Sequence, residues 1–225
     1  MQRSQDDLFA ASEGNRYFLR NQEAYNAFNP GQDPPIRLLE LYQVRPKNAL
    51  EVGCSSGFRL AAIAERYGAR VVGCEPSAEA IAAGRQRYPK VEFIQARASA
   101  LPLDGPFDLV IVNYVFHWID RSTLLRSVAE VDRVVADGGF LLLGDFAPVN
   151  RHKRPYHHLP GESVFTYKQD YAGVFLASGL YYPVGMLIGD HSTGDLQSCV
   201  PEDDRAGHWL MRKTLGENYV ERTLT

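Results

Sequence analysis

Two neighbouring stretches of the chain carry the residues best suited to bind a ligand. Residues 49–57 read Ala-Leu-Glu-Val-Gly-Cys-Ser-Ser-Gly, and residues 70–75 read Arg-Val-Val-Gly-Cys-Glu. Gly53 and Gly57 allow a tight turn that a ligand can approach closely, and the backbone N–H groups of such a turn favour a negative group. The carboxylate of Glu75 is able to accept hydrogen bonds from both hydroxyls of a ribose. The spacing therefore predicts a site for a ligand that contains ribose.

The elements around these residues follow an alternation of apolar strands and amphipathic helices. Strands are expected over residues 48–52, 70–74, 91–95, 107–113 and 139–144. Helices are expected over residues 59–67, 77–88 and 121–135. Strands that are apolar throughout and alternate with helices are typical of a parallel sheet covered on both faces. The ligand site then lies at the carboxyl edge of the sheet, where open α/β sheets bind their ligands.

The sequence changes character after Phe146. A polar loop is expected over residues 150–161, a helix over 168–178, and two strands over 180–188 and 206–213. Residues 171–189 carry no charge, but Pro183 and several glycines favour the end of a buried helix capped by Gly179, and then a strand, over a membrane span. The predicted fold is thus α/β: a doubly wound, Rossmann-like, seven-stranded sheet with a C-terminal antiparallel hairpin.

Composition and charge restrict the function classes. The chain has 225 residues, with 24 Lys and Arg against 27 Asp and Glu, for a formal net charge of −3. This near balance gives no electrostatic footprint for nucleic-acid binding. The three scattered cysteines, Cys54, Cys74 and Cys199, favour neither a disulfide framework nor a zinc site. The N-terminus carries charges where a signal peptide needs an apolar core, so the expected location is the cytoplasm.

The glycine turn distinguishes between two cofactor classes. A dinucleotide fingerprint that starts at Gly53 would need glycine at the positions of Ser55 and Phe58. An NAD-dependent oxidoreductase is therefore a disfavoured alternative. The pattern present is an acidic residue, Glu51, followed by Gly-x-x-x-Gly. It resembles motif I of the class I S-adenosylmethionine-dependent methyltransferases, with Ser55 in place of the middle glycine.

Further segments are similar to that family in the same order. Glu75 resembles the acidic residue at the end of its second strand, and residues 96–102, 107–112 and 137–143 resemble three later motifs. The resemblance implies S-adenosylmethionine as the cofactor and S-adenosylhomocysteine as the product. It also implies a small-molecule acceptor, as in the small-molecule branch (methyltransferase types 11 and 12). The polar segment after the fifth predicted strand, rich in His and Tyr, suggests that this acceptor is polar, such as a sugar or a natural-product intermediate.

The resemblance implies a single methyltransferase domain over residues 1–225. Its parts would be N-terminal lid helices (1–44), the cofactor-binding core (45–146), and a substrate loop with the C-terminal hairpin (147–225). The partner is expected to be a small molecule, with no nucleic acid and no membrane, and a homodimer is left open. A non-catalytic cofactor-binding module of the same fold is an alternative that Ser55 and Arg97 permit.

The cofactor-binding residues implied by this resemblance come from the lid, the glycine turn and the strand ends. They are Tyr17, Glu51, Gly53, Cys54, Ser55, Gly57, Glu75, Pro76, Arg97, Ala98, Asn113 and Tyr114. Arg97 is the main departure, because the family has an aspartate there that contacts the adenine amine, and a guanidinium has no acceptor. Either a backbone carbonyl near Ala98 replaces that contact, or Arg97 stacks on the adenine.

His117 is the candidate catalytic residue. It follows the fourth predicted strand, where the family places residues between cofactor and substrate, and an imidazole that titrates near neutrality suits a general base. A histidine bonded to a helix end is the alternative interpretation. No metal site is expected, because His157 and His158 lack a third ligand at metal spacing.

Overall fold

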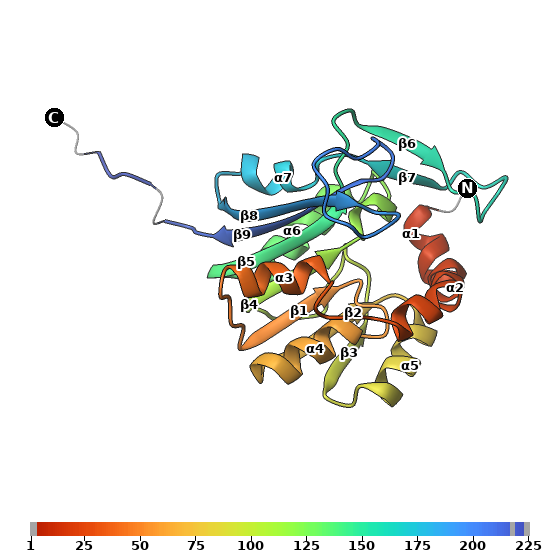
Figure 1. The fold of residues 1–225 in the computed structure, drawn as a ribbon, viewed down its shortest axis with the longest axis horizontal. Coiled ribbons are helices and arrows are strands. Elements are labelled where there is room, and N and C mark those ends of the chain that lie inside the picture. Colours follow the sequence, from red (N-terminus) through yellow and green to blue (C-terminus); the bar gives the residue numbers. More distant parts are fainter. Residues whose placement is uncertain (1–3, 217–218, 223–225) are drawn as a thin grey trace.

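The computed structural model describes residues 4–216 and 219–222 (Figure 1). The ends of the predicted domain, residues 1–3 and 223–225, lie outside the described residues, as do residues 217–218. The helices are α1 (Gln5–Leu8), α2 (Gly14–Asn26), α3 (Pro34–Leu41), α4 (Phe58–Tyr67), α5 (Ala78–Arg87), α6 (Leu124–Val134) and α7 (Ala172–Ala177). A π-helical turn η1 (Phe9–Glu13) joins α1 to α2, and a 3-10 turn η2 (Phe116–Trp118) follows the fourth strand.

Most of the strands belong to one large sheet. The strands are β1 (Asn48–Val52), β2 (Arg70–Glu75), β3 (Val91–Gln95), β4 (Phe107–Asn113), β5 (Val135–Phe146), β6 (His152–Pro155), β7 (Phe165–Lys168), β8 (Tyr181–Asp190) and β9 (Arg205–Lys213). Seven of them form a sheet in the order β3-β2-β1-β4-β5-β9-β8. Strands β1–β5 run parallel, and β9 runs antiparallel between β5 and β8. The predicted doubly wound fold with a C-terminal antiparallel hairpin is confirmed.

The strand order determines where a ligand can bind. β1 pairs with β2 on one side and with β4 on the other. The chain therefore winds outward in opposite directions from β1 and β4. Such a switch point opens a crevice at the carboxyl ends of the two strands, and open α/β sheets bind ligands there.

Helices cover both faces of the large sheet. α3, α4 and α5 pack on one face through a buried cluster that includes Leu39, Leu60 and Ile81. α6 and α7 pack on the other face through a second cluster that includes Val131 and Phe175. The central strands are thus buried on both sides, which explains why they are continuous apolar runs in the sequence.

Local signals in the sequence fix where helices begin. The Asp33 side chain caps α3 by accepting a hydrogen bond from the amide of Ile36 at 3.1 Å, and Pro34 lies in the first turn. Ser77 caps α5 in the same way through the amide of Ala80, at 3.1 Å. The cap of α5 lies two residues after the end of β2, at the carboxyl edge of the sheet.

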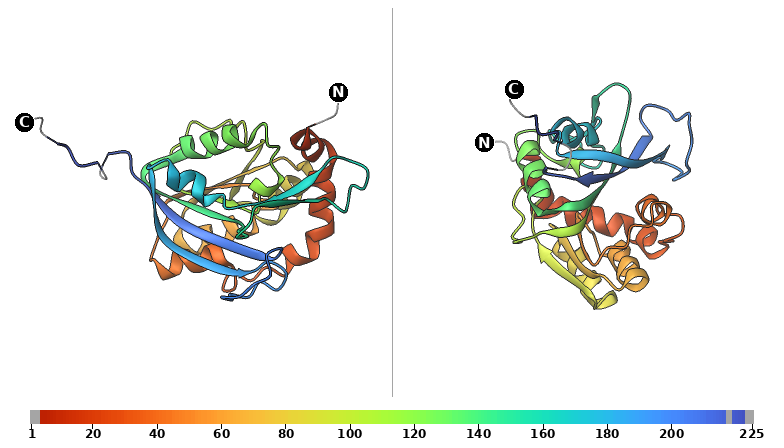
Figure 2. Two further views of the ribbon diagram at one scale, coloured as in Figure 1. Left: turned by 90° about the horizontal axis from the view of Figure 1, so that it is seen from above. Right: turned by 90° about the vertical axis from the view of Figure 1, so that its left-hand side faces the viewer.

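The N-terminal helices lie beside the β6–β7 hairpin at one end of the large sheet (Figures 1 and 2). The Gln5 Nε2 donates hydrogen bonds to the carbonyls of Trp118 at 2.7 Å and Phe165 at 2.8 Å. The Gln5 Oε1 accepts from the amide of Phe165 at 2.9 Å. The Asp6 carboxylate also accepts from the amide of Asp120 at 2.8 Å. One short helix therefore holds η2 and β7 together.

Two expectations for the C-terminal third are wrong. Residues 152–155, inside the predicted polar loop, form β6, which pairs antiparallel with β7. Lys168 ends β7, so the helix predicted over 168–178 begins only at Ala172. β6 is too short and too polar to show the alternation that marks a strand in a sequence. The uncharged stretch 171–189 forms α7 and most of β8, and no helix within the described ranges is long and apolar enough to cross a membrane.

Candidate functional site

A cavity of about 280 Å³ lies at the carboxyl ends of β1, β2 and β4, beneath the N-terminal helices. Every residue predicted to bind the cofactor lines it except Gly57. The full lining is Asp6, Phe9, Gly14, Tyr17, Phe18, Tyr25, Glu51, Val52, Gly53, Cys54, Ser55, Phe58, Arg59, Glu75, Pro76, Ala96, Arg97, Ala98, Asn113, Tyr114, Val115, Trp118, Ile119 and His191. The cavity coincides with the crevice that the strand order opens, and it is the candidate functional site.

The turn after β1 forms one side of the cavity. Gly53 and Gly57 adopt left-handed conformations with φ of 74° and 77°, which glycine reaches without strain. A Cβ on Gly53 would collide with Val115, and a Cβ on Gly57 would lie 2.7 Å from Phe93 Cζ. Both glycines are therefore required by the close packing of the turn. Gly53 lines the cavity, whereas Gly57 packs against Phe93 and does not line it.

Glu75 is held in one orientation by the backbone of two turns. Its Oε2 accepts a hydrogen bond from the amide of Ser55, and its Oε1 accepts one from the amide of Ser77, both at 2.9 Å. Burial raises the pKa of the Glu75 carboxyl to about 7, although the two amides oppose this shift. A carboxylate offers about four acceptor positions, so further positions remain for donors from a ligand.

Arg59, Asp33 and Glu51 form a buried ionic network next to the glycine turn. The Arg59 guanidinium makes a bidentate pair with Asp33, with Nη2 2.9 Å from Oδ2 and Nε 3.0 Å from Oδ1, and it also pairs with Glu51. Burial alone would lower the pKa of Arg59, but the two carboxylates outweigh it and raise that pKa. Burial raises the pKa of Glu51, and Arg59 opposes this shift. The network joins the cap of α3, the end of β1 and the start of α4.

Three buried oxygens at the cavity have no hydrogen-bond partner within the part of the chain that the structure describes. They are Glu51 Oε2, Ser55 Oγ and Asn113 Oδ1. Buried polar atoms are nearly always paired in folded proteins, so unpaired acceptors at a cavity indicate a ligand that brings donors. An ammonium group, with three N–H donors and no acceptor, matches this set.

Aromatic rings from the N-terminal helices close the cavity. The Phe9 ring lies 5.0 Å from the Trp118 ring, and the Tyr17 ring meets Trp118 edge-on at 6.2 Å. Deeper along the same side, the Tyr25 ring stacks on Phe58 at 5.1 Å. Aromatic faces of this kind bind flat heterocycles and cations. Tyr17 therefore lies at the cavity, and its role in a lid stays a prediction.

Arg97 has an acidic partner that was not predicted. Its Nη1 lies 2.7 Å from Asp7 Oδ1, so it links α1 to the segment after β3. The Ser4 hydroxyl and Arg97 both lower the pKa of Asp7. Ala98, one residue further along, is buried and lines the cavity. Its backbone stays available to a ligand while the Arg97 guanidinium pairs with the lid.

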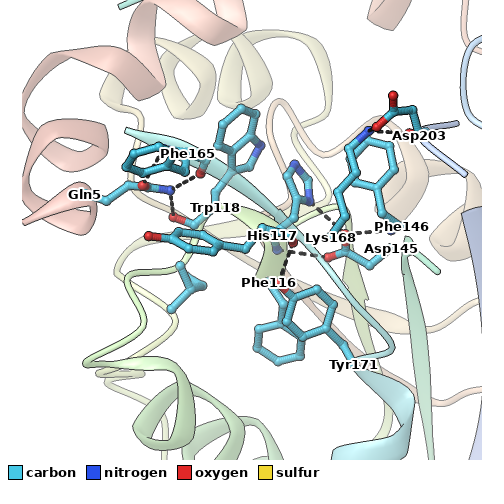
Figure 3. A network of polar contacts seen from close by, with 12 residues as sticks. Gln5, Phe116, His117, Trp118, Asp145, Phe146, Phe165, Lys168, Tyr171 and Asp203 are labelled. Atoms are coloured by element: carbon cyan, nitrogen blue, oxygen red, sulfur yellow. Dashed lines mark hydrogen bonds and ion pairs between the residues drawn. The ribbon is translucent and has the colours of Figure 1, made fainter. Parts of the chain in front are cut away.

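His117 lies beside the cavity and does not line it. Its side chain is buried, with Nδ1 2.8 Å from Asp145 Oδ1, and its amide donates to Asp145 Oδ2 at 3.2 Å (Figure 3). The ring also packs against Trp118 at 4.6 Å and Phe146 at 5.1 Å. Asp145 therefore fixes the orientation of the imidazole. The role of His117 as general base stays a prediction.

Cys54 lines the cavity, but its chemistry is that of a small apolar side chain. The thiol is buried, and burial raises its pKa well above the ordinary value. Burial also raises the pKa of the neighbouring Cys74 thiol to about 12. Both cysteines therefore stay protonated at neutral pH and pack as apolar residues.

His191 lines the cavity although no motif marks it. It follows β8, and its ring lies 4.7 Å from the Tyr114 ring. Because β9 is antiparallel to both β5 and β8, β8 runs parallel to β5 and ends at the same edge of the sheet. The only indication in the sequence was that His191 directly follows this strand.

Comparisons with known proteins show similarity to methyltransferases over part of the chain. Residues 49–139 match the family model described as a methyltransferase domain. Trans-aconitate 2-methyltransferase of Azoarcus sp. (strain BH72) is 37% identical over 116 residues, 51% of this chain and 44% of that protein. Malonyl-(acyl-carrier protein) O-methyltransferase of Geobacter sulfurreducens is 37% identical over 142 residues, 57% of this chain and 52% of that protein. The chain spans about half the length of these curated relatives.

Solved structures share the fold at low sequence identity. The 1,6-didemethyltoxoflavin-N1-methyltransferase of Burkholderia thailandensis, bound to 1,6-didemethyltoxoflavin and S-adenosylhomocysteine, has a TM-score of 0.70 at 17% identity, covering 90% of this chain and 86% of that one. The N-methyltransferase NodS of Bradyrhizobium japonicum WM9, also bound to S-adenosylhomocysteine, has a TM-score of 0.57 at 17% identity, covering 80% and 88%.

The sheet order, the glycine turn and the acidic end of β2 suit a class I methyltransferase domain. The match over residues 49–139 and the two curated relatives agree with that assignment. Over this region the chain is similar to S-adenosylmethionine-dependent methyltransferases.

Proposed function

We propose that the chain binds S-adenosylmethionine in this cavity and transfers its methyl group to a small polar molecule, such as a sugar or a natural-product intermediate. The observation that carries the proposal is Glu75, a buried carboxylate oriented by the amides of Ser55 and Ser77 at the end of β2. Such a carboxylate suits the two hydroxyls of a ribose. The relatives named above are methyltransferases of small or carrier-bound molecules, which supports the same reaction class.

The lining residues suit the separate parts of this cofactor. Glu75 would accept the ribose hydroxyls, with the neighbouring Pro76 and Ala98 beside the adenine. The unpaired oxygens of Glu51, Ser55 and Asn113 would accept the ammonium group of the methionine part. Gly53 and Cys54 lie between these regions, and Tyr17 and Tyr114 are proposed to close over the methionine part. Arg97 would act through its pair with Asp7, holding the lid over the cofactor.

The residues of this chain would catalyse the reaction mainly by positioning. S-adenosylmethionine supplies a methyl group on a positively charged sulfur, and a substrate atom must approach that methyl in line. Holding two bound reactants in such a geometry can remove most of the barrier, and the aromatic lid also excludes water. An acceptor that loses a proton needs a base within hydrogen-bond reach. His117, oriented by Asp145, is one candidate for that base.

The proposal extends to the organisation of the chain as a single domain. Residues 1–44 would form the lid, residues 45–146 the cofactor-binding core, and residues 147–225 the substrate loop and hairpin. Supporting this division, Phe9 and Tyr17 close the cavity from the N-terminal helices, and His191 reaches it from the C-terminal part.

A turnover assay tests the proposal. The purified protein is incubated with S-adenosylmethionine and a fractionated small-molecule extract, and S-adenosylhomocysteine is measured by mass spectrometry. We expect release well above that of the Glu75→Gln variant. Binding of S-adenosylmethionine without release would instead favour the non-catalytic module. Heat on titration with NAD, and none with S-adenosylhomocysteine, would favour the oxidoreductase.

A further inference from the structure

We propose that the methyl acceptor is a flat, uncharged aromatic molecule with an N–H or O–H group, and that His191 takes the proton from this group. The inference rests on the proposed function and deepens it, because it names the acceptor class and assigns the base to His191 in place of His117. Three observations carry it: the aromatic walls of one end of the cavity, the pairing of every cation that lines it, and the position of the His191 ring.

Aromatic rings line the cavity at the ends of β4 and β8. The ring of Tyr114, the residue after β4, lies 4.7 Å from the His191 ring after β8. Phe9 and Trp118 face each other at 5.0 Å where the lid meets η2. Tyr114 has a left-handed backbone with φ of 56°, held by a hydrogen bond from its amide to the carbonyl of Gly144 at 2.7 Å. The rings of each pair touch one another, so a flat aromatic ligand would pack against a pair and not between its two rings.

The charges that line the cavity disfavour an anionic acceptor. Its two guanidinium groups are both paired, Arg59 with Asp33 and Glu51 and Arg97 with Asp7. The cavity is lined in addition by the carboxylates of Asp6, Glu51 and Glu75. A carboxylate-bearing acceptor would therefore lose its hydration without gaining an unpaired guanidinium from the protein, which is costly. An uncharged acceptor incurs no such cost.

His191 is placed to receive a proton at this end. Its amide donates to the carbonyl of Asp204 at 2.7 Å, and its ring also rests on Phe146 at 4.7 Å. Neither ring nitrogen makes a hydrogen bond to any residue that the structure describes, and the side chain is exposed enough to pass a proton to solvent. His117, in contrast, has its Nδ1 on Asp145 and does not line the cavity.

The protonation state of His191 is set by its surroundings. Desolvation by the adjacent rings, and then the nearby His117 and Lys168, lower the pKa of His191, so at neutral pH its imidazole is uncharged and able to accept a proton. Asp145 and Asp204 oppose this shift. The ionisable groups that face His191 are His117 on η2, Asp145 on β5, Lys168 on β7, His208 on β9, Tyr114 after β4, and Asp190 and Asp204 at the two ends of its connection.

The proposed step balances in atoms and charge. A lone pair on the acceptor nitrogen or oxygen forms the new bond to the methyl carbon. The bond from that carbon to sulfur breaks, and its electron pair stays on sulfur, which becomes an uncharged thioether. The proton of the acceptor moves to an imidazole nitrogen of His191, and from there to water. No oxidant, reductant or further reactant is needed.

A matched pair of ligands tests the inference by binding alone. 2-Naphthol and 2-naphthoate share one ring system, but at pH 8 the first is an uncharged O–H donor and the second is an anion. Each is titrated by calorimetry into the protein saturated with S-adenosylhomocysteine. We expect 2-naphthol to bind at least tenfold more tightly than 2-naphthoate. The affinity for 2-naphthol should fall as the pH is lowered through the pKa of His191, because a protonated imidazole no longer accepts a hydrogen bond.

Variants then assign the effect to His191. His191→Phe keeps a ring against Tyr114 but removes the acceptor, so the affinity for 2-naphthol should fall about three- to tenfold and its pH dependence should disappear. His157→Phe, an exposed histidine away from the cavity lining, is the matched control and should match the wild type. Both variants should bind S-adenosylhomocysteine as the wild type does.

Several results would overturn the inference. These are equal or tighter binding of 2-naphthoate, binding of neither ligand, or a pH dependence that survives in His191→Phe and disappears in His117→Phe. Loss of S-adenosylhomocysteine binding by the wild type is a different result. That result would contradict the proposed function itself. Failure of the acceptor proposal, with S-adenosylhomocysteine still bound, can therefore be told apart from failure of the proposed function.

Discussion

The amide of Ser55 donates a hydrogen bond to Glu75 Oε2 at 2.9 Å, and this contact makes the turn after β1 and the end of β2 one unit. Ser55 has a left-handed backbone, with φ of 51°, at the position where the related family usually has its middle glycine. The interaction uses only the backbone of Ser55, so a serine performs it as well as a glycine does. The departure from the family pattern at this position therefore leaves the carboxylate correctly placed.

The raised pKa of Glu75 predicts a specific dependence of stability on pH. Its carboxyl titrates at about 7 in the folded protein and near 4.5 in the unfolded chain, so the folded state binds more protons between these values. The free energy of unfolding should therefore fall as the pH rises from about 4.5 to about 7. Glu75→Gln lacks this contribution. Urea unfolding measures the free energy of unfolding of both proteins at pH 5 and pH 8. Between these two values the wild type should lose more of it than Glu75→Gln does. An equal change in both proteins would contradict the raised pKa of Glu75.

Arg59 should be essential for stability. Arg59→Met leaves Asp33 and Glu51 as buried carboxylates without their partner, which costs about 3–5 kcal/mol for a broken buried pair. The free energy of unfolding from urea denaturation measures this loss. Arg66→Met breaks an exposed pair with Glu40 and should cost less than about 1 kcal/mol. Equal costs for the two variants would show that the buried network is not a structural support.

The glycine turn should not tolerate a side chain at position 53. In Gly53→Ala the new Cβ meets Val115 and the backbone must keep a left-handed conformation, so we expect a loss of about 2 kcal/mol or more in the free energy of unfolding. The second change Val115→Ala should recover the part due to collision but not the part due to backbone strain. If Val115→Ala restored all of the lost free energy of unfolding, or none of it, the loss could not be a sum of collision and backbone strain.

The contacts of Gln5 should determine how firmly the lid is attached. Gln5→Ala removes three hydrogen bonds to the backbone of Trp118 and Phe165. Amide hydrogen exchange over residues 5–13 should accelerate about tenfold or more, since each such bond contributes about 1 kcal/mol, while exchange in the central strands stays unchanged. Asn21→Ala, which removes a bond within α2 to the carbonyl of Tyr17, is the control. Unchanged exchange in Gln5→Ala would show that α1 is held by other contacts.

The sequence predicted the large sheet well because its strands carry strong and local signals. β1, β3 and β4 have the predicted bounds, since a strand buried on both faces is apolar along its whole length. β6 was missed because three polar residues and a proline, paired only with β7, show no periodicity. Its pairing depends on a partner strand ten residues further along, which local patterns do not report.

The residues of the candidate site likewise fall into those that a local motif predicts and those that only the fold brings together. Gly53, Ser55 and Glu75 follow a motif with fixed spacing, and the structure brings them together at one cavity. His191 is more than a hundred residues from these motifs, and only the parallel course of β8 brings it to the same edge. Arg59 was missed because a cation in the first turn of a helix is ordinarily a surface residue, and here Asp33 and Glu51 bury it.

Calorimetric titration of S-adenosylhomocysteine into the wild type and Glu75→Gln tests whether the Glu75 carboxylate binds the ribose of the cofactor. We predict one site in the wild type and an affinity about tenfold to a hundredfold lower in the variant, since hydrogen bonds to a charged group contribute about 1.5–3 kcal/mol. Glu92→Gln, an exposed carboxylate on β3 paired with Arg70, should bind like the wild type. Equal affinities for the wild type and Glu75→Gln, with both proteins folded, would contradict the account.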